Sequence, residues 1–256
     1  MKQAVKKLKP RIFKLLQKAI QPIAEKLGYV LKSKTELGNG KNVLIGLAFK
    51  NLKSKGFIPK HILDIGANHG TWTREVIEIF PNAQYSLIEP QYWLEKSSLD
   101  LQKKHLVKFY PIGMGDRNEN LTFTIHERDD SSSFRFSDTE GEKLGYRTIK
   151  TQMLTIDSFL KENSLPVPEI IKIDAEGLDL EVLKGAESTF GITDVFLVEA
   201  SVHQKEFPNT ILRVTEFMNE KGYEIFDFTD LNRPFGNQLL WLVEILFIKN
   251  NSSFGS

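Results

Sequence analysis

Two short segments of the sequence pair an acidic residue with a strand-like apolar run, in a spacing suited to a nucleotide-like cofactor. The first joins an acid to a turn of small and polar residues: Asp64, Gly66, Ala67, Asn68 and Gly70. Glycine lets the backbone approach a ligand closely, and a helix predicted from Thr71 points unpaired N–H groups into the same space. Glu89 ends the second run, where a carboxylate accepts hydrogen bonds from ribose hydroxyls. The pattern predicts strand, tight loop, helix and strand, which is a βαβ unit that binds a cofactor.

Two classes of cofactor use such a unit, dinucleotides and S-adenosylmethionine (SAM), and the charge of Asp64 favours SAM. A dinucleotide would place a doubly negative pyrophosphate over the loop, where a carboxylate at the strand end repels it. SAM places its sulfonium and amino groups there instead. Gly66 and Gly70, with Asn68 between them, also lack the G-x-G-x-x-G pattern that a pyrophosphate needs. We therefore predict SAM as the cofactor; the alternative is a tight turn in another kind of α/β enzyme.

A second group of charged residues lies on the predicted strand 169–174 and directly after it. Lys172 and Asp174 fall on one face of this strand, and Glu176 follows two residues later. The strand should be buried on both sides, where a lysine is costly unless a carboxylate pairs with it. Because the strand should end beside the cofactor loop, we expect these charges to serve the site.

His203 lies just beyond the next predicted strand, 195–199. Methyl transfer from SAM to a hydroxyl needs an in-line approach to the sulfonium methyl and a base that removes the hydroxyl proton. We predict a catalytic group of four residues: Lys172, Asp174, Glu176 and His203, with His203 as the preferred base. In the alternative, Lys172, Asp174 and Glu199 form an ion-pair network that only orients the strand ends. Asp174 and Glu176 could hold a divalent metal, but we predict none, because the sequence offers no clear third ligand.

The amino-acid composition limits the classes of protein to which this chain can belong. A chain of 256 residues with 41% hydrophobic residues can bury one substantial core, which predicts one domain with appendages. A net charge of +1 gives no sign of nucleic-acid binding. The absence of cysteine excludes disulfides, thiolate zinc sites and cysteine nucleophiles. No apolar run approaches the ~20 residues that span a bilayer, so we expect a cytoplasmic protein.

The N-terminal part of the sequence is strongly basic. Residues 1–34 hold ten basic residues and one acid, Glu25, while apolar residues recur at helical spacing. Such a helix can cover the edge of a domain with its lysines in water, which is the usual fate of lysine and our preferred interpretation. It could instead attach to the inner face of an anionic membrane or to an acidic carrier. We divide the chain into a basic helical extension (1–58), a catalytic domain (59–250) and a tail (251–256).

Strand and helix patterns alternate beyond the first unit. Further strands are predicted at 106–112, 169–174, 195–199, 223–228 and 242–248, with helices at 42–55, 92–103 and 211–221. We predict an α/β fold with a Rossmann-like, doubly wound sheet of seven mostly parallel strands that ends in an antiparallel hairpin. Residues 116–168 form an insertion between the third and fourth strands. Its β-like stretches, 121–126 and 148–154, flank a polar, serine-rich loop at 129–145, and such segments often close over a substrate.

Several blocks of the sequence resemble the FkbM family of SAM-dependent methyltransferases, in that family's order. They are Leu63–Gly70, Ile88–Pro90, Gly113–Asp116, Leu154–Phe159 and Ile171–Gly177, the last continuing from Glu181 to Ala186. The resemblance extends from about Pro59 to Asn250 and does not include the first 58 residues. It implies O-methylation of hydroxyl groups on polyketides, sugars or glycolipids.

The resemblance also implies roles for individual residues. The methionine part of SAM would be held by Asp64, Gly66, Asn68 and Gly70, the ribose by Glu89 and the adenine by the loop around Gly113. Asp174, Glu176 and His203 would face the acceptor. The family usually has a branched residue where this chain has Ala175.

Three classes of function remain open. We expect an O-methyltransferase whose acceptor is a sugar, a glycolipid or another hydroxylated small molecule. A nucleotide-dependent oxidoreductase is the second class, but the chain lacks both the glycine pattern and a Tyr-x-x-x-Lys pair at the end of a middle strand. A non-catalytic SAM-binding scaffold is the third, and it would leave the inward-facing Lys172 unexplained. The oligomeric state is not predicted.

Overall fold

A computed structural model of the protein describes residues 41–125, 147–203, 208–234 and 239–254, together with Ile20, Pro22, Ile23 and Lys26, which are helical. The rest of the predicted N-terminal helix and the predicted loop 129–145 lie outside the described residues. The chain divides into two compact units, Met1–Asn42 and Val43–Ser256. None of the helices within the described ranges is long and apolar enough to cross a bilayer.

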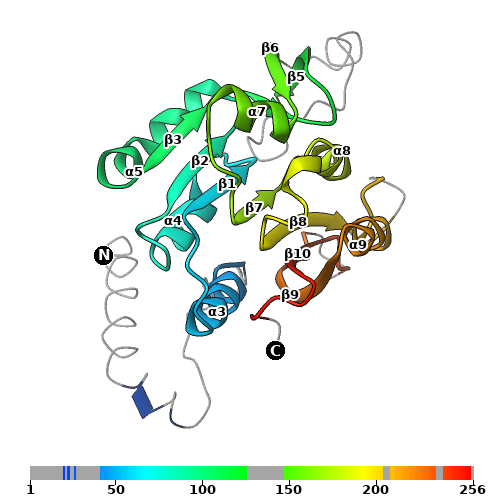
Figure 1. The fold of residues 1–256 in the computed structure, drawn as a ribbon. Coiled ribbons are helices and arrows are strands. Elements are labelled where there is room, and N and C mark those ends of the chain that lie inside the picture. The colour runs from blue at the N-terminus through cyan, green and yellow to red at the C-terminus, as the bar shows by residue number, and fades with distance from the viewer. Residues whose placement is uncertain are drawn as a thin grey trace, which may run out of the picture. The chain divides into compact units, whose positions relative to one another are not determined.

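The second unit is built on a seven-stranded sheet (Figure 1). In spatial order its strands are β3 (Val107–Tyr110), β2 (Gln84–Ile88), β1 (His61–Ile65), β7 (Ile170–Ile173), β8 (Val195–Ser201), β10 (Leu242–Lys249) and β9 (Tyr223–Asn232). The first five pair in parallel, and β10 is antiparallel to both β8 and β9. This order confirms the predicted doubly wound, mostly parallel sheet and its C-terminal antiparallel hairpin.

Helices cover both faces of this sheet, because its strands are apolar on both sides. The helical elements are α3 (Lys41–Ser54), α4 (Thr71–Ile77), η1 (Tyr92–Ser98), α5 (Leu99–Lys104), α7 (Ile156–Glu162), α8 (Asp179–Lys184), η3 (Glu187–Thr189) and α9 (Ile211–Glu220). Buried side chains of α3, α4 and α5 form one core cluster, and those of α7, α8 and α9 form the other. The single helix predicted at 92–103 is therefore a 3₁₀ helix followed by a short α-helix.

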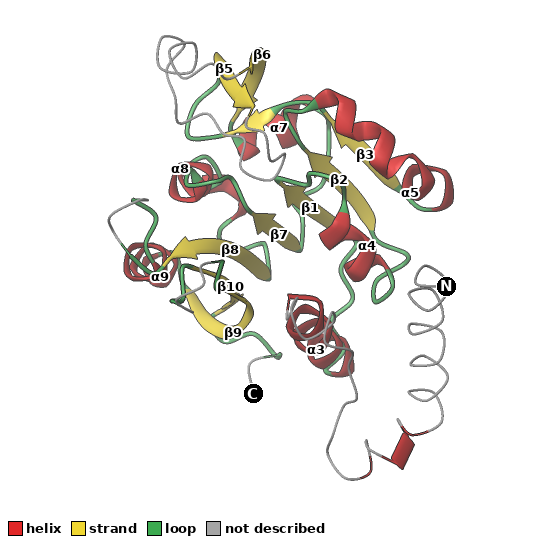
Figure 2. Ribbon diagram, turned by 180° about the vertical axis from the view of Figure 1, so that it is seen from behind, coloured by secondary structure: helices red, strands yellow, loops and turns green. Residues whose placement is uncertain are grey.

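The predicted insertion supplies two of the three strands of a second, small sheet, and the remaining strand lies just before the insertion. The strands of this sheet lie in the order β4 (Gly113–Met114), β6 (Arg147–Leu154) and β5 (Glu119–Ile125), and Figure 2 shows β5 and β6 projecting from the main sheet. The insertion also contains α7, which the sequence analysis does not predict. The Thr155 side chain caps this helix by accepting the N–H of Ser158 at 3.1 Å.

The compact unit begins earlier than the predicted domain boundary at residue 58. In α3, Phe49 and Leu52 are fully buried in the same core cluster as Ile62 of β1 and Val76 of α4. Most of α3 therefore packs within the second compact unit, which begins at Val43, and the predicted division of the chain into domains stays a prediction. The predicted tail also contributes to packing, since the ring of Phe254 contacts that of Phe57 at 5.0 Å between centroids.

The C-terminus of α8 lies tightly against the small sheet, which gives a testable prediction. A Cβ at Gly185 would lie 2.1 Å from the backbone oxygen of Gly115, so Gly185→Ala should lower the free energy of unfolding by about 1–3 kcal/mol. Gly46 on α3 is the matched control, because nothing lies within 4 Å of a Cβ placed there. Gly46→Ala should be neutral or stabilise by up to about 1 kcal/mol through helix propensity. Urea denaturation measures both, and equal effects of the two substitutions would contradict the tight contact.

Candidate active site

The cofactor loop between β1 and α4 is shaped by three residues with positive φ. These are Gly66 at 73°, Asn68 at 46° and Gly70 at 72°. The N–H groups of Gly66 and Ala67 both donate to the carbonyl of Ile88 at 3.0 Å, which ties the loop to β2. A Cβ at Gly66 would lie 1.9 Å from the backbone oxygen of Asp174. Only glycine fits there, and the loop therefore reaches the end of β7.

Glu89, the predicted ribose ligand, lies buried between the ends of β1 and β2. Its Oε2 accepts the N–H of Asn68 at 3.0 Å, and its Oε1 accepts the N–H of Gln91 at 2.9 Å. Burial raises the pKa of Glu89, while the N–H donors of Gln91 and Asn68 oppose that shift. A carboxylate has about four acceptor sites, and the Nε2 of Gln91 also donates to Oε1 at 3.2 Å, so one site remains for a ribose hydroxyl. The residue fits the predicted role, which stays a prediction.

Asp64 is fully buried and forms an ion pair across the β1–β7 register. Its Oδ2 accepts the hydroxyl of Thr73 at 2.6 Å, and its Oδ1 lies 3.5 Å from the Nζ of Lys172, its register partner. Burial raises the pKa of Asp64, and the charge of Lys172 opposes the shift. In this structure the carboxylate is turned toward Lys172 and Thr73; its predicted contact with SAM is untested.

Lys172 is the buried cation at the centre of the site, with 3% of its surface exposed. Its Nζ lies 3.2 Å from the Oδ2 of Asp174 and donates to the carbonyl of Gly66 at 3.2 Å. Burial favours the neutral amine, but attraction from Asp174, Asp64 and Glu244 outweighs it and raises the pKa of Lys172. An amine that stays protonated cannot act as a base. The ion pair of Lys172 with Asp174 is part of the alternative network of Lys172, Asp174 and Glu199, and both the catalytic role and the orienting role stay predictions.

The predicted acceptor residues lie on the two segments that follow β7 and β8. The side chain of Asp174 is 26% exposed, and Glu176 has a left-handed backbone with φ 50°. His203 is exposed beyond the end of β8, where its ring lies 6.1 Å from that of Trp241. Gly113, predicted to border the adenine, is buried in β4 and pairs with Met153 of β6. The structure thus brings Gly66, Lys172 and Asp174 into contact and places His203 on a separate segment.

Two buried polar residues of this region are not singled out by the sequence analysis. Asp179 is 0% exposed and Asn209 is 1% exposed, and the Nδ2 of Asn209 donates to the Oδ2 of Asp179 at 2.5 Å. Burial raises the pKa of Asp179 to about 7, and its hydrogen bond with the N–H of Ala175 opposes that shift. The sequence signal is weak, because an acid in the first turn of a helix is common. Asn209 lies 30 residues away along the chain.

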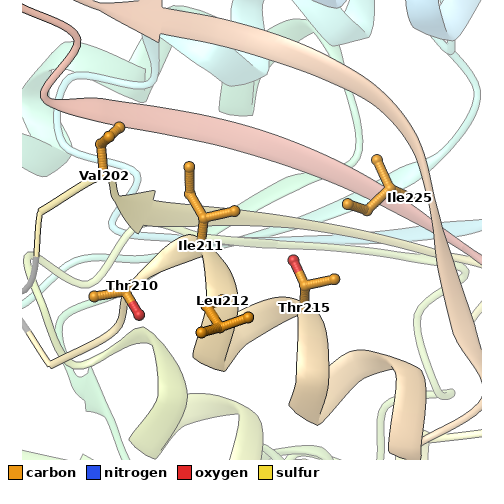
Figure 3. A pocket seen from close by; sticks show the side chains of 6 residues that line it. All are labelled: Val202, Thr210, Ile211, Leu212, Thr215 and Ile225. Atoms are coloured by element: carbon orange, nitrogen blue, oxygen red, sulfur yellow. The ribbon is translucent and has the colours of Figure 1, made fainter.

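An apolar pocket of about 510 Å³ lies beside α9 (Figure 3). Its lining comes from α9, the end of β8 and β9: Val202, Thr210, Ile211, Leu212, Thr215 and Ile225. Val202 precedes His203 directly, but none of the lining residues is a predicted site residue. Within the described ranges, no group of three or more His, Asp or Glu side chains is arranged to hold a metal ion.

Comparison with known families identifies the domain. The methyltransferase FkbM domain matches residues 64–225, which is more than half of the chain. The protein therefore belongs to the FkbM methyltransferase family. The match begins at Asp64 on β1 and ends at Ile225 on β9, so it contains every predicted site residue.

Solved structures give more distant similarities. A methyltransferase FkbM from Methylobacillus flagellatus has a TM-score of 0.49 and 14% identity; the match covers 73% of this chain and 43% of that one. The O-methyltransferase TomG from Streptomyces achromogenes has a TM-score of 0.48 and 12% identity, covering 92% and 89% of the two chains. A precorrin-6y C5,15-methyltransferase from Geobacter metallireducens has a TM-score of 0.46 and 13% identity, covering 81% and 87%. Comparison with curated proteins yields no match. The family assignment rests on the domain match.

The ion pair between Lys172 and Asp64 gives a prediction for stability. Lys172→Met should lower the free energy of unfolding by about 3–5 kcal/mol, because it leaves a buried carboxylate without its counter-charge. Adding Asp64→Asn, which removes that charge, should restore part of the loss. Urea denaturation of the single and double variants measures both effects. Additive losses in the double variant would contradict a coupled pair.

Proposed function

We propose that the protein is a SAM-dependent O-methyltransferase whose acceptor is a sugar, a glycolipid or another hydroxylated small molecule. The observation that carries the proposal is the contact between Gly66 and Asp174, which joins the cofactor loop to a segment bearing predicted acceptor residues. Membership of a methyltransferase family supports the reaction class. When bound, SAM supplies an electrophilic methyl group on its sulfonium.

In the proposed reaction, one group of residues binds the cofactor and another removes the proton of the acceptor. Glu89 and the cofactor loop bind and orient SAM, while Lys172 holds Asp174 at the end of β7 through a 3.2 Å ion pair. His203 or Asp174 accepts the hydroxyl proton of the acceptor, with His203 preferred because imidazole is the most frequent general base in enzymes. Contact of the basic N-terminal helix with an anionic membrane stays a prediction.

Two other functions remain as alternatives. A nucleotide-dependent oxidoreductase would need the loop to face a pyrophosphate, against the charge of Asp64. A scaffold that binds SAM without catalysis would bind the cofactor and transfer nothing. Cofactor binding separates the first alternative from the proposal, and methyl transfer separates the second.

Glu89 provides the test of the cofactor. Glu89→Ala should weaken SAM binding by about 2 kcal/mol, because hydrogen bonds to charged groups contribute ~1.5–3 kcal/mol. Glu169→Ala is the matched control, since Glu169 accepts the N–H groups of Lys60 and His61 at the opposite edge of the sheet. The SAM affinity of the Glu169→Ala variant should equal that of the wild type. Calorimetry measures these affinities. If the wild type binds NADH but not SAM, or if Glu89→Ala and Glu169→Ala bind SAM equally well, Glu89 is not the ribose ligand of a SAM site.

The second test concerns methyl transfer and its base. Incubation with methyl-labelled SAM and fractionated cell extract should label a hydroxylated acceptor, which identifies the fraction to use. His203→Ala should then lose about 10²–10⁴-fold in rate while keeping its SAM affinity. The rate and the SAM affinity of Asp174→Asn are measured in the same experiment. If His203→Ala loses tenfold or less in rate while Asp174→Asn loses nearly all activity, the base is Asp174 and not His203. If the wild type binds SAM but labels no acceptor, the non-catalytic scaffold is favoured.

A further inference from the structure

The segment from Asp174 to Gly177 leaves β7 through an unusual turn. Glu176 has φ 50° and Gly177 has φ 96°, so two consecutive residues lie in the left-handed region. This region is unfavourable for a glutamate, because its Cβ crowds the backbone. Neighbouring groups must therefore hold the turn, and with it the directions of the Asp174 and Glu176 side chains.

Asp179, in the first turn of α8, holds this segment from inside the protein. Its Oδ1 accepts the N–H of Ala175 at 2.9 Å, and its Oδ2 accepts the N–H of Gly177 at 3.2 Å. One carboxylate thus satisfies the N–H groups on both sides of Glu176. The side chain is fully buried, so it acts on the segment and not on a ligand.

Asn209 connects Asp179 to the end of β8. Its Nδ2 donates to the Oδ2 of Asp179 at 2.5 Å and to the carbonyl of Glu199 at 3.4 Å. Its backbone carbonyl accepts the N–H of Ser201 at 3.0 Å. A continuous chain of hydrogen bonds therefore runs from the turn after β7 to the last residues of β8, and we call it the Asp179–Asn209 clamp.

We propose that Asp179 and Asn209 are positioning residues, which fix the segment Asp174–Gly177 relative to the end of β8 and so aim Asp174 and Glu176 at the acceptor. The inference rests on the proposed function for the acceptor role of those two residues. The clamp itself is a statement about hydrogen bonds, and it can be tested without methyl transfer.

The pairing of β7 with β8 does not depend on the clamp. The two strands form a parallel ladder, and at its amino end the hydroxyl of Thr193 donates to the carbonyl of Pro168 at 2.8 Å. On the cofactor side, Lys172 and Gly66 hold Asp174 independently. Loss of the clamp should therefore loosen the turn toward the acceptor while leaving the cofactor loop in place.

The expected effect is a separation of catalysis from cofactor binding. A small misplacement of reacting groups can cost about 10²-fold in rate. Asn209→Ala should therefore lower kcat by about 100-fold while the Kd for SAM stays within about twofold. Amide hydrogen exchange at Ala175 and Gly177 should become at least about tenfold faster, because the clamp no longer opposes local opening.

The experiment compares Asn209→Ala with Thr193→Val in the full-length protein. Thr193→Val removes a buried hydrogen bond between the segments that lead into the same two strands, at the opposite edge of the sheet, so it controls for loss of stability. Exchange is followed by mass spectrometry over residues 174–178, SAM binding by calorimetry, and transfer of labelled methyl to the acceptor fraction by scintillation counting. Asp179→Asn, which replaces one of the two acceptor oxygens by an NH2 group that faces a donor, is the second variant if Asn209→Ala does not fold; it should show changes at least as large in the same direction.

Faster exchange and slower transfer in Asn209→Ala, with both near wild type in Thr193→Val, support the proposal. Unchanged exchange at 174–178, or an equal increase in both variants, overturns the clamp. Faster exchange with wild-type kcat overturns the positioning role. A wild type that transfers no label refutes the proposed function instead, and the exchange data then still decide whether the clamp holds the turn.

Discussion

The site depends on one close approach, that of the cofactor loop to the end of β7. Because a Cβ at Gly66 would lie 1.9 Å from the backbone oxygen of Asp174, the two segments can meet only with glycine at this position. Their contact brings the carbonyl of Gly66 within reach of the Nζ of Lys172, which also holds Asp174. The strand ends are thus joined by backbone and charge together, at the edge where open α/β sheets bind their ligands.

The buried charges at this edge are arranged around a single cation. Lys172 draws Asp64 from β1 and Asp174 from its own strand, and Glu244 on β10 adds to the attraction. These acids come from three strands, so the lysine links β1, β7 and β10 by charge. In the sequence, the charge of Asp64 is what favours the sulfonium of SAM over a pyrophosphate.

Much of this could be predicted from local pattern, and the rest could not. Apolar runs locate the strands, and the two-residue spacing of Lys172 and Asp174 places them on one face, as observed. The packing of α3 against the core through Phe49 and Leu52 could not be predicted, because the sequence of this helix resembles that of any amphipathic surface helix. The roles of Asp179 and Asn209 could not be predicted, because their hydrogen bond joins residues that are 30 apart in the chain, and no local pattern encodes such a contact. The catalytic and cofactor roles remain predictions, since the structure gives their geometry and not their chemistry.

The two edges of the sheet are tied in different ways, and this difference separates stability from function. At the amino edge, Glu169 accepts the N–H groups of Lys60 and His61, and the hydroxyl of Thr193 donates to the carbonyl of Pro168, so these bonds join residues at or just before the starts of neighbouring strands. At the carboxyl edge, Glu89 and Asp179 use the same chemistry to hold loops, through the N–H groups of Asn68 and Gln91 and of Ala175 and Gly177. A buried carboxylate that binds loop N–H groups fixes where the loop's other groups point. Substitutions at the amino edge should therefore change the free energy of unfolding. Substitutions at the carboxyl edge should instead change the positions of the loop groups that are predicted to contact ligands.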